Sequence, residues 1–170
     1  MAGLAASFGS GAMTNSISEI EDAARLFIIG SNTTEAHPLI SQRVFAAKRK
    51  GARLIVVDPR RIQLALCADI HVRVNFGTDV ALLNGMMHEI IHKGYHDQSF
   101  IEKRTEGFAE LKEMLVDYSP EKASEICGVP PETIREIAMI YATSEPSSIL
   151  YTLGITEHSH GVDNVKTLAN

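Results

Sequence analysis

Four short apolar runs, separated by segments with other patterns, constrain the fold of this sequence most strongly. They cover residues 24–30, 52–59, 69–74 and 147–155. Continuous apolar runs of this length are typical of strands that are covered on both faces. Because helical segments lie between them, we expect the strands to pair mostly in parallel. The sequence therefore predicts an α/β fold with a doubly wound sheet, a Rossmann-like αβα sandwich.

The segments between these runs have helical patterns. Apolar residues at helical spacing predict a helix over residues 38–50, and residues 62–67 form a short connecting segment. Residues Phe76 to Asp79 begin a long helix that extends to about residue 93. The last segment, residues 161–170, begins like a helix and stops without a C-cap, as in a chain that has been cut.

A longer stretch, residues 97–144, contains helical patterns and no strand signal. Ser119 followed by Pro120 is an N-cap with proline at the first helical position, and Pro131 begins another helix. We expect this helical excursion, about residues 95–145, to pack on one side of the sheet. The whole chain, residues 1–170, is then expected to form one domain.

Composition and charge exclude several classes of protein. Apolar residues make up 45% of the chain and the net charge is −5, which disfavours a nucleic-acid or anionic-membrane surface. No apolar run approaches the length of a membrane span, and the first residues lack the pattern of a signal peptide. We therefore expect a cytoplasmic location. Cys67 and Cys127 are isolated, which predicts neither an iron–sulfur cluster nor a zinc site within the chain.

Polar and small residues follow each predicted strand. In an open parallel sheet, ligands bind beyond the carboxyl ends of the strands. The candidates are Gly30, Ser31, Asn32 and Glu35 after the first strand; Asp58, Pro59 and Arg60 after the second; Gly77, Thr78 and Asp79 after the third; and Gly154, Thr156 and Glu157, with His158 next, after the last. We expect these residues to converge on one ligand site.

The residue types at these strand ends suit a nucleotide. Gly30 permits a tight turn and a close approach to a ligand, and the helix that begins near Pro38 directs free N–H groups at a phosphate. Asp58 can accept hydrogen bonds from ribose, and the Arg60 guanidinium can bind phosphate. Asp79 can accept two hydrogen bonds from the N1–H and amino groups of guanine.

Simpler structural interpretations exist for the same residues. Thr78 and Asp79 can cap a helix, Asp58 can form a turn, and Glu35 and Arg60 can be surface charges. The dinucleotide fingerprint G-x-G-x-x-G is absent after Gly30, which disfavours a standard NAD site.

The long helix contains the sequence HEIIH, residues 88–92, which matches the zinc-peptidase pattern H-E-x-x-H. That chemistry requires both imidazoles on one helix face, Glu89 as general base, and a third ligand. The apolar residues of the helix form one stripe, and away from it lie Ala81, Asn84, Gly85, His88 and His92. We expect this second face to contact solvent, which disfavours a peptidase site.

Seven segments, in order along nearly the whole chain, resemble one protein family. They are GLAASFGSGAMTNSISEIEDA, IIGSNTTEAHP, RLIVVDPR, CADIHVRVNFGTDVALLNGM, RTEGFAELK, YSPEKASEICGVPPETIREIA and ILYTLGITEHSHGVDNV. They are similar to the catalytic alpha subunit of molybdenum- or tungsten-dependent formate dehydrogenases, which are bis-molybdopterin guanine dinucleotide oxidoreductases. The resemblance implies one α/β domain of a larger subunit, the domain that holds one of the two pterin dinucleotides.

The resemblance also implies cofactor contacts at four motifs. In this sequence they are Gly30, Asn32 and Glu35; Asp58, Pro59 and Arg60; Gly77, Thr78 and Asp79; and Gly154, Thr156 and Glu157. Glu35 and Glu157 differ from the Asp and Gln that many relatives have, which alters the pterin or ribose atom that each can reach.

The implied reaction is the oxidation of formate to carbon dioxide, with two electrons passing through the metal to iron–sulfur clusters. In the family, the metal is held by a cysteine or selenocysteine followed by a histidine, a few residues before the segment that begins here at Ala2. The residues that hold the metal, the iron–sulfur segment and a catalytic arginine of the family are not among the 170 residues. We therefore expect no catalytic residue in this chain and no formate oxidation by it alone.

The expected partners are the remaining domains of the parent alpha subunit and its electron-transfer subunits, with self-association of the separate domain as a further expectation. Two alternatives remain for the function. One is a domain of another molybdopterin oxidoreductase, such as a nitrate reductase. The other is a non-catalytic nucleotide-binding module.

Overall fold

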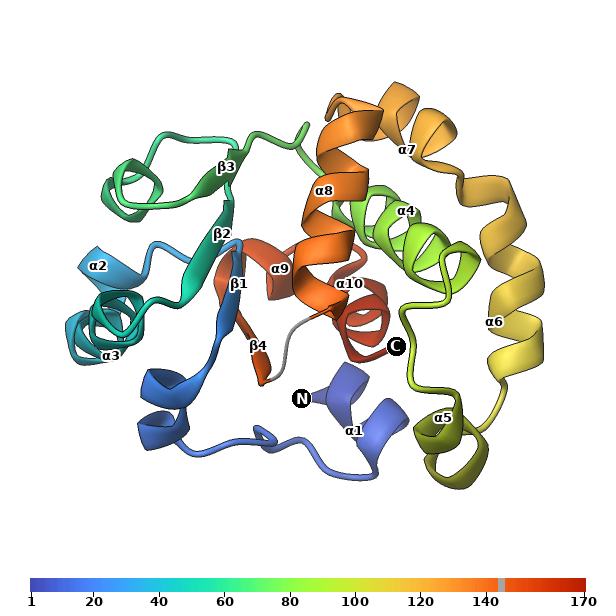
Figure 1. The fold of residues 1–170 in the computed structure, drawn as a ribbon, viewed down its shortest axis with the longest axis horizontal. Helices are drawn as coiled ribbons and strands as arrows, with labels where there is room; N and C mark the ends of the chain where they lie inside the picture. Colours follow the sequence, from blue (N-terminus) through green and yellow to red (C-terminus); the bar gives the residue numbers. More distant parts are fainter. Residues whose placement is uncertain (144–145) are drawn as a thin grey trace.

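A four-stranded parallel sheet forms the centre of the protein, in the order β3-β2-β1-β4 (Figure 1). The computed structural model describes residues 1–143 and 146–170. The strands are β1 (Arg25–Ile29), β2 (Arg53–Val57), β3 (Ile70–Val72) and β4 (Ser147–Tyr151). All three strand pairs are parallel. The predicted α/β fold with a parallel sheet is confirmed.

Helices occupy most of the remaining described residues. Those before and between the first three strands are α1 (Ala2–Phe8), η1 (Ile17–Asp22), α2 (Thr33–Ala36), α3 (Pro38–Arg49) and η2 (Gln63–Leu66). Those between β3 and β4 are α4 (Asp79–His92), α5 (Gln98–Arg104), α6 (Phe108–Leu115), η3 (Val116–Tyr118), α7 (Pro120–Cys127) and α8 (Pro131–Ala142). After β4 come α9 (Leu153–Thr156) and α10 (Gly161–Ala169). The end of the predicted helical excursion, at residues 144–145, lies outside the described residues.

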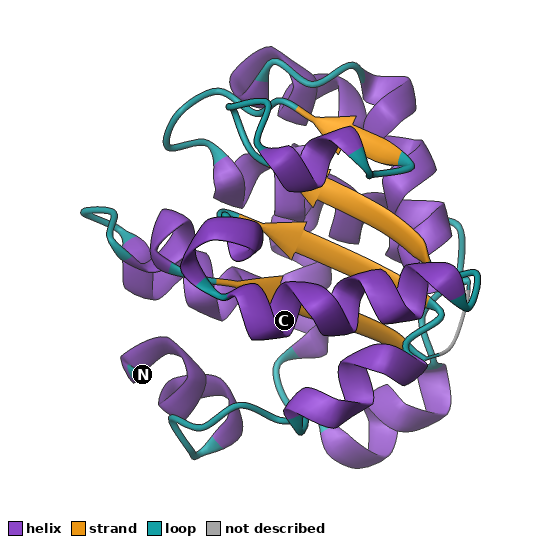
Figure 2. Cartoon of the chain, turned by 90° about the vertical axis from the view of Figure 1, so that its left-hand side faces the viewer, coloured by secondary structure: helices purple, strands orange, loops and turns teal. Residues whose placement is uncertain are grey.

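The sheet separates two apolar layers, because successive side chains of a strand point to opposite faces. On one face, Leu26 and Ile28 of β1 pack with Val44 and Ala47 of α3. Figure 2 shows helices on both sides of the stacked strands. The side chains of Leu26, Ile28, Val44 and Ala47 are fully buried. Burial of a side chain as large as valine or leucine contributes about 1.5–3 kcal/mol to the free energy of unfolding.

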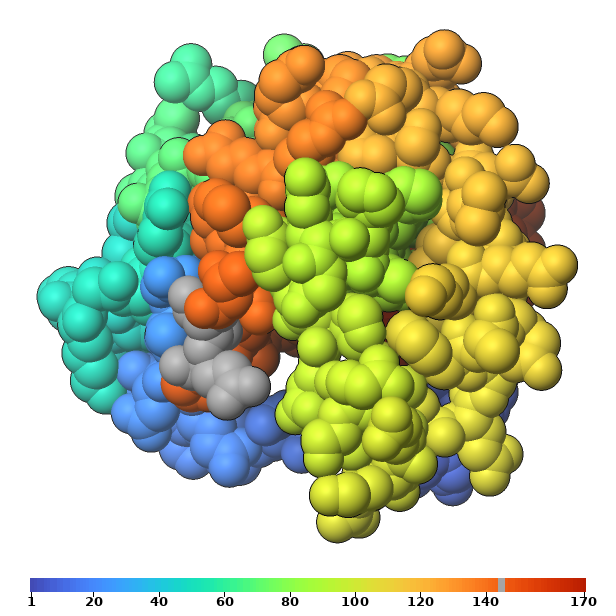
Figure 3. Space-filling model, turned by 45° about the vertical axis from the view of Figure 1, so that its right-hand side comes forward, coloured from blue at the N-terminus to red at the C-terminus, as the bar shows by residue number. Residues whose placement is uncertain are grey.

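The opposite face of the sheet is covered by more helices. Phe27 and Ile29 of β1 share an apolar cluster with Leu82 of α4 and with Ile134 and Ile137 of α8. Helix α4 contacts α6, α7, α8 and α10. Figure 3 shows α6, α7 and α8 around the segment of α4 and α5.

The prediction that the second face of α4 contacts solvent is wrong for three of its five residues. Ala81, Asn84 and Gly85 are buried. A Cβ atom on Gly85 would lie 2.7 Å from the Ala123 side chain of α7 and 3.4 Å from Ile134 of α8. The physical reason is that α7 and α8 pack on this side of α4, so a face with small and polar residues is covered.

Two predicted segments differ from the structure at the sheet edge. The last strand ends at Tyr151 rather than residue 155, because the Gly154 N–H bonds to the carbonyl of Gly30 and α9 begins at Leu153. The residues between the first strand and Pro38 were expected to form a loop, but Thr33–Ala36 form the short helix α2. Among the described residues, no helix has both the length and the apolar character needed to cross a bilayer.

Candidate functional site

The carboxyl ends of all four strands lie at one edge of the sheet, because the strands are parallel (Figure 2). The loops after β1 and β4 touch each other there. The Gly154 N–H donates to the Gly30 carbonyl at 3.1 Å, and the Thr152 hydroxyl donates to the same oxygen at 2.9 Å. Two of the four predicted loops are thus held together by hydrogen bonds.

Both glycines at this contact are required by the packing of the chain on itself. Gly30 has φ +57°, and a Cβ atom there would lie 2.7 Å from the carbonyl carbon of Gly154. A Cβ atom on Gly154 would lie 2.6 Å from the Gly30 carbonyl oxygen. The close approach that the sequence indicated at Gly30 is therefore an approach to another loop of the same chain.

The residues after Gly30 form a compact turn into α2. The buried Ser31 hydroxyl lies 2.9 Å from the Thr33 hydroxyl. Asn32 is the N-cap of α2 without a side-chain cap, and its Oδ1 accepts a hydrogen bond from the Thr34 hydroxyl at 3.3 Å. Glu35 is exposed. Ser31 thus shapes the loop, whereas Glu35 is open to solvent.

The turn after β2 combines a buried carboxylate with an exposed guanidinium. Asp58 is buried, and its Oδ1 accepts the backbone N–H of Arg60 at 2.8 Å. The Arg60 side chain is 68% exposed, with Nε 3.6 Å from the same oxygen. The Pro59 carbonyl accepts a hydrogen bond from Arg73 Nε at 3.1 Å. The turn interpretation of Asp58 is therefore correct for one of its oxygens, while most N–H groups of Arg60 face solvent and can bind an anion.

The loop after β3 places a buried carboxylate at the start of α4. Thr78 is the N-cap, but its hydroxyl donates to the Asn75 carbonyl at 2.8 Å instead of capping the helix. Asp79 follows as the first helical residue and is 5% exposed. Burial raises the pKa of the Asp79 carboxyl above its ordinary value, while a hydrogen bond from its own N–H and the charges of His158 and His160 act in the opposite direction.

Two histidines connect the end of β4 to this loop. The rings of His158 and His160 are 5.6 Å apart between centroids. The His160 Cε1 atom lies 3.9 Å from the position of a Cβ atom on Gly77, which has φ +74°. The preceding residues Thr156 and Glu157 are exposed. The structure therefore adds His160 to the candidate site. Its sequence signal was the His-x-His pattern directly after the predicted strand end.

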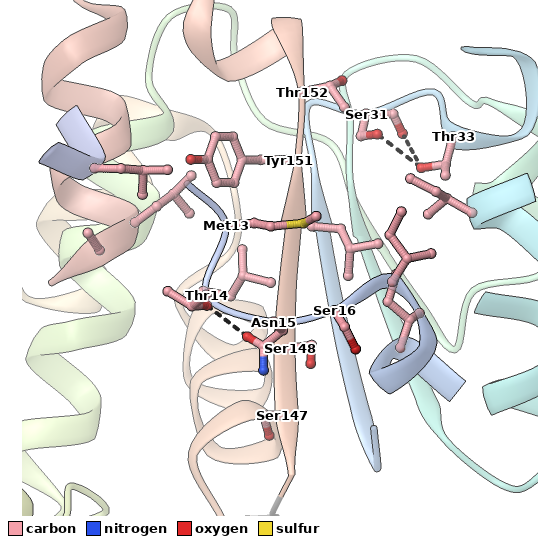
Figure 4. Close-up of a pocket in the computed structure, with 18 of the residues that line it drawn as sticks. Met13, Thr14, Asn15, Ser16, Ser31, Thr33, Ser147, Ser148, Tyr151 and Thr152 are labelled. Atoms are coloured by element: carbon pink, nitrogen blue, oxygen red, sulfur yellow. Dashed lines mark hydrogen bonds between the residues drawn. The ribbon is translucent and has the colours of Figure 1, made fainter. Parts of the chain in front are cut away.

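A cavity of about 570 Å³ lies beside the loop after β1 (Figure 4). Its walls include Ser31 and Thr33, Thr152 at the end of β4, and residues 13–16 of the N-terminal arm. Among the predicted site residues, Ser31 alone lines it. No sequence pattern indicated this cavity, because residues 9–16 of the arm have no pattern that predicts their path along β4.

The HEIIH segment does not form a peptidase site. Glu89 is buried, and its carboxylate lies 3.9 Å from Nε of Arg135 on α8, so it is not available as a general base. In the described part of the chain, no group of three or more His, Cys, Asp or Glu side chains is arranged to hold a metal ion. Cys67 is exposed and Cys127 is buried, and both are free thiols.

The groups at the carboxyl edge fit the nucleotide part of a pterin dinucleotide. The Asp79 carboxylate has no side-chain hydrogen-bond donor as partner among the described residues, so it can accept hydrogen bonds from a base. Arg60 supplies an exposed cation for a phosphate, and the second oxygen of Asp58 can accept from a ribose hydroxyl. These groups bind and orient a ligand, and none of them forms a nucleophile–base pair.

Comparisons with known proteins agree with this geometry. The family model described as molybdopterin oxidoreductase matches residues 3–170. The F420-dependent formate dehydrogenase subunit alpha of Methanocaldococcus jannaschii is 54% identical over 168 residues, 99% of this chain and 25% of that protein. A nitrate reductase of Symbiobacterium thermophilum is 39% identical over 95% of this chain and 23% of its own length.

A solved structure supports the same assignment. Acetylene hydratase from Pelobacter acetylenicus superposes with a TM-score of 0.82 and 29% identity, over 90% of this chain and 23% of that chain. The chain thus spans about a quarter of the length of these proteins. The match to the family model covers almost every residue, and the chain shares its fold with the corresponding part of acetylene hydratase. This chain belongs to the molybdopterin oxidoreductase family.

Proposed function

We propose that this chain is a cofactor-binding domain of a formate dehydrogenase alpha subunit, and that its carboxyl edge binds the guanosine diphosphate part of a molybdopterin guanine dinucleotide. Family membership implies a molybdopterin cofactor. The guanine assignment rests on Asp79, whose buried carboxylate lies at the first position of α4, directly after the loop that follows β3.

The chemistry of Asp79 favours guanine over adenine. A carboxylate only accepts hydrogen bonds, and guanine presents two adjacent donors, N1–H and the amino group, to one planar acceptor pair. Adenine has no N1–H donor. A buried carboxylate that accepts no hydrogen bond from another side chain costs free energy, and such a cost is typical of a binding residue. Asp79 is therefore proposed as the residue that selects the base.

The remaining contacts follow from the same edge. We assign the phosphates to the exposed Arg60 guanidinium and the ribose to Asp58. Gly30 and Gly154 are assigned a positioning role, because their contact sets the shape of the loop wall beside the ligand. Glu35, Thr156 and Glu157 are exposed and are proposed to meet the cofactor only where other parts of a larger subunit close over it.

Formate is the proposed substrate of the parent subunit, because the formate dehydrogenase relative has the higher sequence identity. The bound metal–pterin group would accept the two electrons released when formate becomes carbon dioxide. An iron–sulfur cluster is proposed for other parts of that subunit. The residues of this domain bind and orient the cofactor, so the domain alone does not distinguish formate from nitrate as substrate.

Exposed apolar side chains support a covering partner at the carboxyl edge. Phe76, in the loop before α4, is 86% exposed, and Leu153, in α9, is 62% exposed. Large apolar side chains at the rim of a ligand edge are typical of a surface that another domain covers. We assign this role to the rest of the parent alpha subunit, whose relatives are about four times longer than this chain. A cytoplasmic location stays a prediction.

Isothermal titration calorimetry with GDP tests the guanine assignment. We expect the wild type to bind GDP with a Kd of about 0.1–1 mM, since only part of the cofactor is present. Asp79→Asn should weaken binding about tenfold or more, because the amide places a donor opposite a donor. The matched control is Asp97→Asn, which changes an exposed carboxylate that caps α5. ADP should bind more weakly and show no difference between the variants.

Equal GDP binding by the wild type and Asp79→Asn would remove Asp79 from the site. An equal loss in Asp97→Asn would show that the effect is not local to the carboxyl edge. No detectable binding of GDP by the wild type at millimolar concentration would contradict the proposed nucleotide site itself.

A further inference from the structure

We propose that His88 and His92 on α4 form a two-histidine site for a late first-row divalent cation, of the class Cu²⁺, Ni²⁺ and Zn²⁺. The site is separate from the carboxyl edge and does not depend on the proposed function. It uses the HEIIH segment in a way that differs from a peptidase centre, since Glu89 takes no part in it.

The two imidazoles lie side by side on one face of the helix. Residues four apart on an α-helix are neighbours on its surface. The ring centroids of His88 and His92 are 6.0 Å apart, and the ring planes differ by only 11°. The lone pairs of the imidazoles lie in the ring planes, so the stacked rings do not point at one ion in this arrangement. Rotation of the exposed His92 side chain to another rotamer brings one of its nitrogens toward an ion bound at His88, with Zn–N distances of about 2.0–2.1 Å.

The orientation of His88 is fixed by a hydrogen bond from its other nitrogen. His88 Nδ1 lies 2.8 Å from the backbone carbonyl of Leu115, at the end of α6. A carbonyl oxygen only accepts, so Nδ1 carries the proton and donates. Nε2 is therefore the nitrogen with a free lone pair. Histidines that bind metal ions usually donate their second N–H to a carbonyl or carboxylate in this way.

The second ligand is accessible. His92 is the last residue of α4 and is exposed, whereas His88 is half-buried. In Figure 3 the segment that contains the end of α4 reaches the surface between α8 and α6. A cation from solution can thus reach both rings without any movement of the core.

The surroundings restrict the kind of ion. Glu89 is buried beside Arg135 on α8, and Nε2 of His96 lies 3.2 Å from Oε1 of Gln98. No third His, Cys, Asp or Glu completes a cluster with this pair in the described residues. Two imidazoles and water suit Cu²⁺, Ni²⁺ or Zn²⁺, whereas Mg²⁺ and Ca²⁺ prefer oxygen ligands. The expected order of affinity is Cu²⁺ above Ni²⁺ and Zn²⁺.

The test combines calorimetry and NMR on the full chain. NiCl₂ and ZnCl₂ are titrated into the wild type, His92→Ala and the control His37→Ala, which removes an exposed histidine at the start of α3. We expect binding of one ion at α4, paramagnetic broadening by Ni²⁺ centred on the amides near His92, and affinity at that site lowered about tenfold or more in His92→Ala. His37→Ala should bind as the wild type does, and MgCl₂ should give no signal.

His92 is exposed, so its removal is not expected to disturb folding, and circular dichroism of each variant verifies this. The proposal is overturned if Ni²⁺ broadens no amide of α4, or if His92→Ala retains the broadening and the affinity of the wild type. Broadening confined to His158 and His160 also overturns it, because that result places the ion at the other histidine pair.

Discussion

Helices α3 and α4 lie on opposite faces of the same sheet and differ in how many neighbours they have. Helix α3 packs through Val44 and Ala47 on one face of the sheet, contacts only the short helices η1 and α2 besides, among the described elements with several contacts, and has exposed residues elsewhere. Helix α4 packs on the sheet and is also enclosed by α6, α7, α8 and α10. The position of α3 could be predicted from its single apolar stripe, whereas the surroundings of α4 could not. A helix that is buried along one stripe shows its environment in its sequence pattern, but a helix that is enclosed on several sides does not.

The comparison predicts the largest effect for Gly85→Val in α4. The added side chain must displace Ala123 and Ile134, so we expect a loss of about 1–3 kcal/mol in the free energy of unfolding. The matched change in α3 is Ala46→Val at a half-exposed position, where we expect about 0.5 kcal/mol. Urea unfolding measures both values. Equal, small effects would mean that α7 and α8 do not enclose α4.

A polar contact that holds α3 to the sheet predicts the next effect. Asp69 Oδ2 accepts hydrogen bonds from Lys48 Nζ at 2.8 Å and from the Leu54 N–H at 2.7 Å. Burial alone would raise the pKa of Asp69, but these hydrogen bonds and the charges of Lys48 and Arg53 outweigh it and lower the pKa below its ordinary value.

A lowered pKa means that Asp69 stabilises the folded chain above its unfolded pKa near 3.8, and that this contribution is lost as the pH falls through the folded value. Asp69→Asn should therefore cost about 1 kcal/mol at pH 7, and less below pH 3.8. The exposed Asp117→Asn is the control, with little expected effect. Urea unfolding at pH 7 and below pH 3.8 measures the free energy of unfolding of each variant. A cost of Asp69→Asn that does not change with pH would contradict the stabilising role of the Asp69 carboxylate.

Asp79, at the start of α4, should show the opposite dependence on pH and the smallest effect. Its pKa is raised by burial, so the folded chain holds the proton more tightly than the unfolded chain does. This contribution to stability is present below pH 3.8 and is lost as the pH rises through the folded value. Asp79→Asn should thus gain stability relative to the wild type between pH 3.5 and pH 7, by less than about 1 kcal/mol. Denaturation midpoints of the wild type and Asp79→Asn at pH 3.5 and pH 7 measure this gain. A difference between the two proteins that is the same at both pH values would show that burial does not raise the pKa of Asp79.

Much of the sheet could be predicted because buried parallel strands have a strong local signal. The apolar runs around Phe27 and Ile55 identified β1 and β2 to within two residues at each end. The fourth strand was predicted too long, since the contact that ends it joins Gly154 to Gly30, more than 120 residues away. Hydrogen bonds between distant loops have no period in the sequence, so their effect on a strand end cannot be predicted from local patterns.

The meeting of the four strand ends at one edge was predictable from the sequence, and the contacts at that edge were less so. Parallel pairing brings the four strand ends to one edge, and the residues there were named from that rule alone. The contribution of His160 and the cavity along β4 depend on the paths of α10 and of the N-terminal arm. Those paths follow from tertiary packing, such as the contact of Gly3 in α1 with Val165 in α10.

We propose that the carboxyl edge of the sheet binds the guanine nucleotide part of the cofactor. Two-dimensional ¹H–¹⁵N NMR of the chain during a GDP titration tests it most directly. We expect the largest shifts at the amides of Gly30, Gly77, Asp79 and Gly154, and we expect Asp79→Asn to reduce all of them. Shifts confined to the helical layer of α5, α6 and α7, with none at the strand ends, would contradict it.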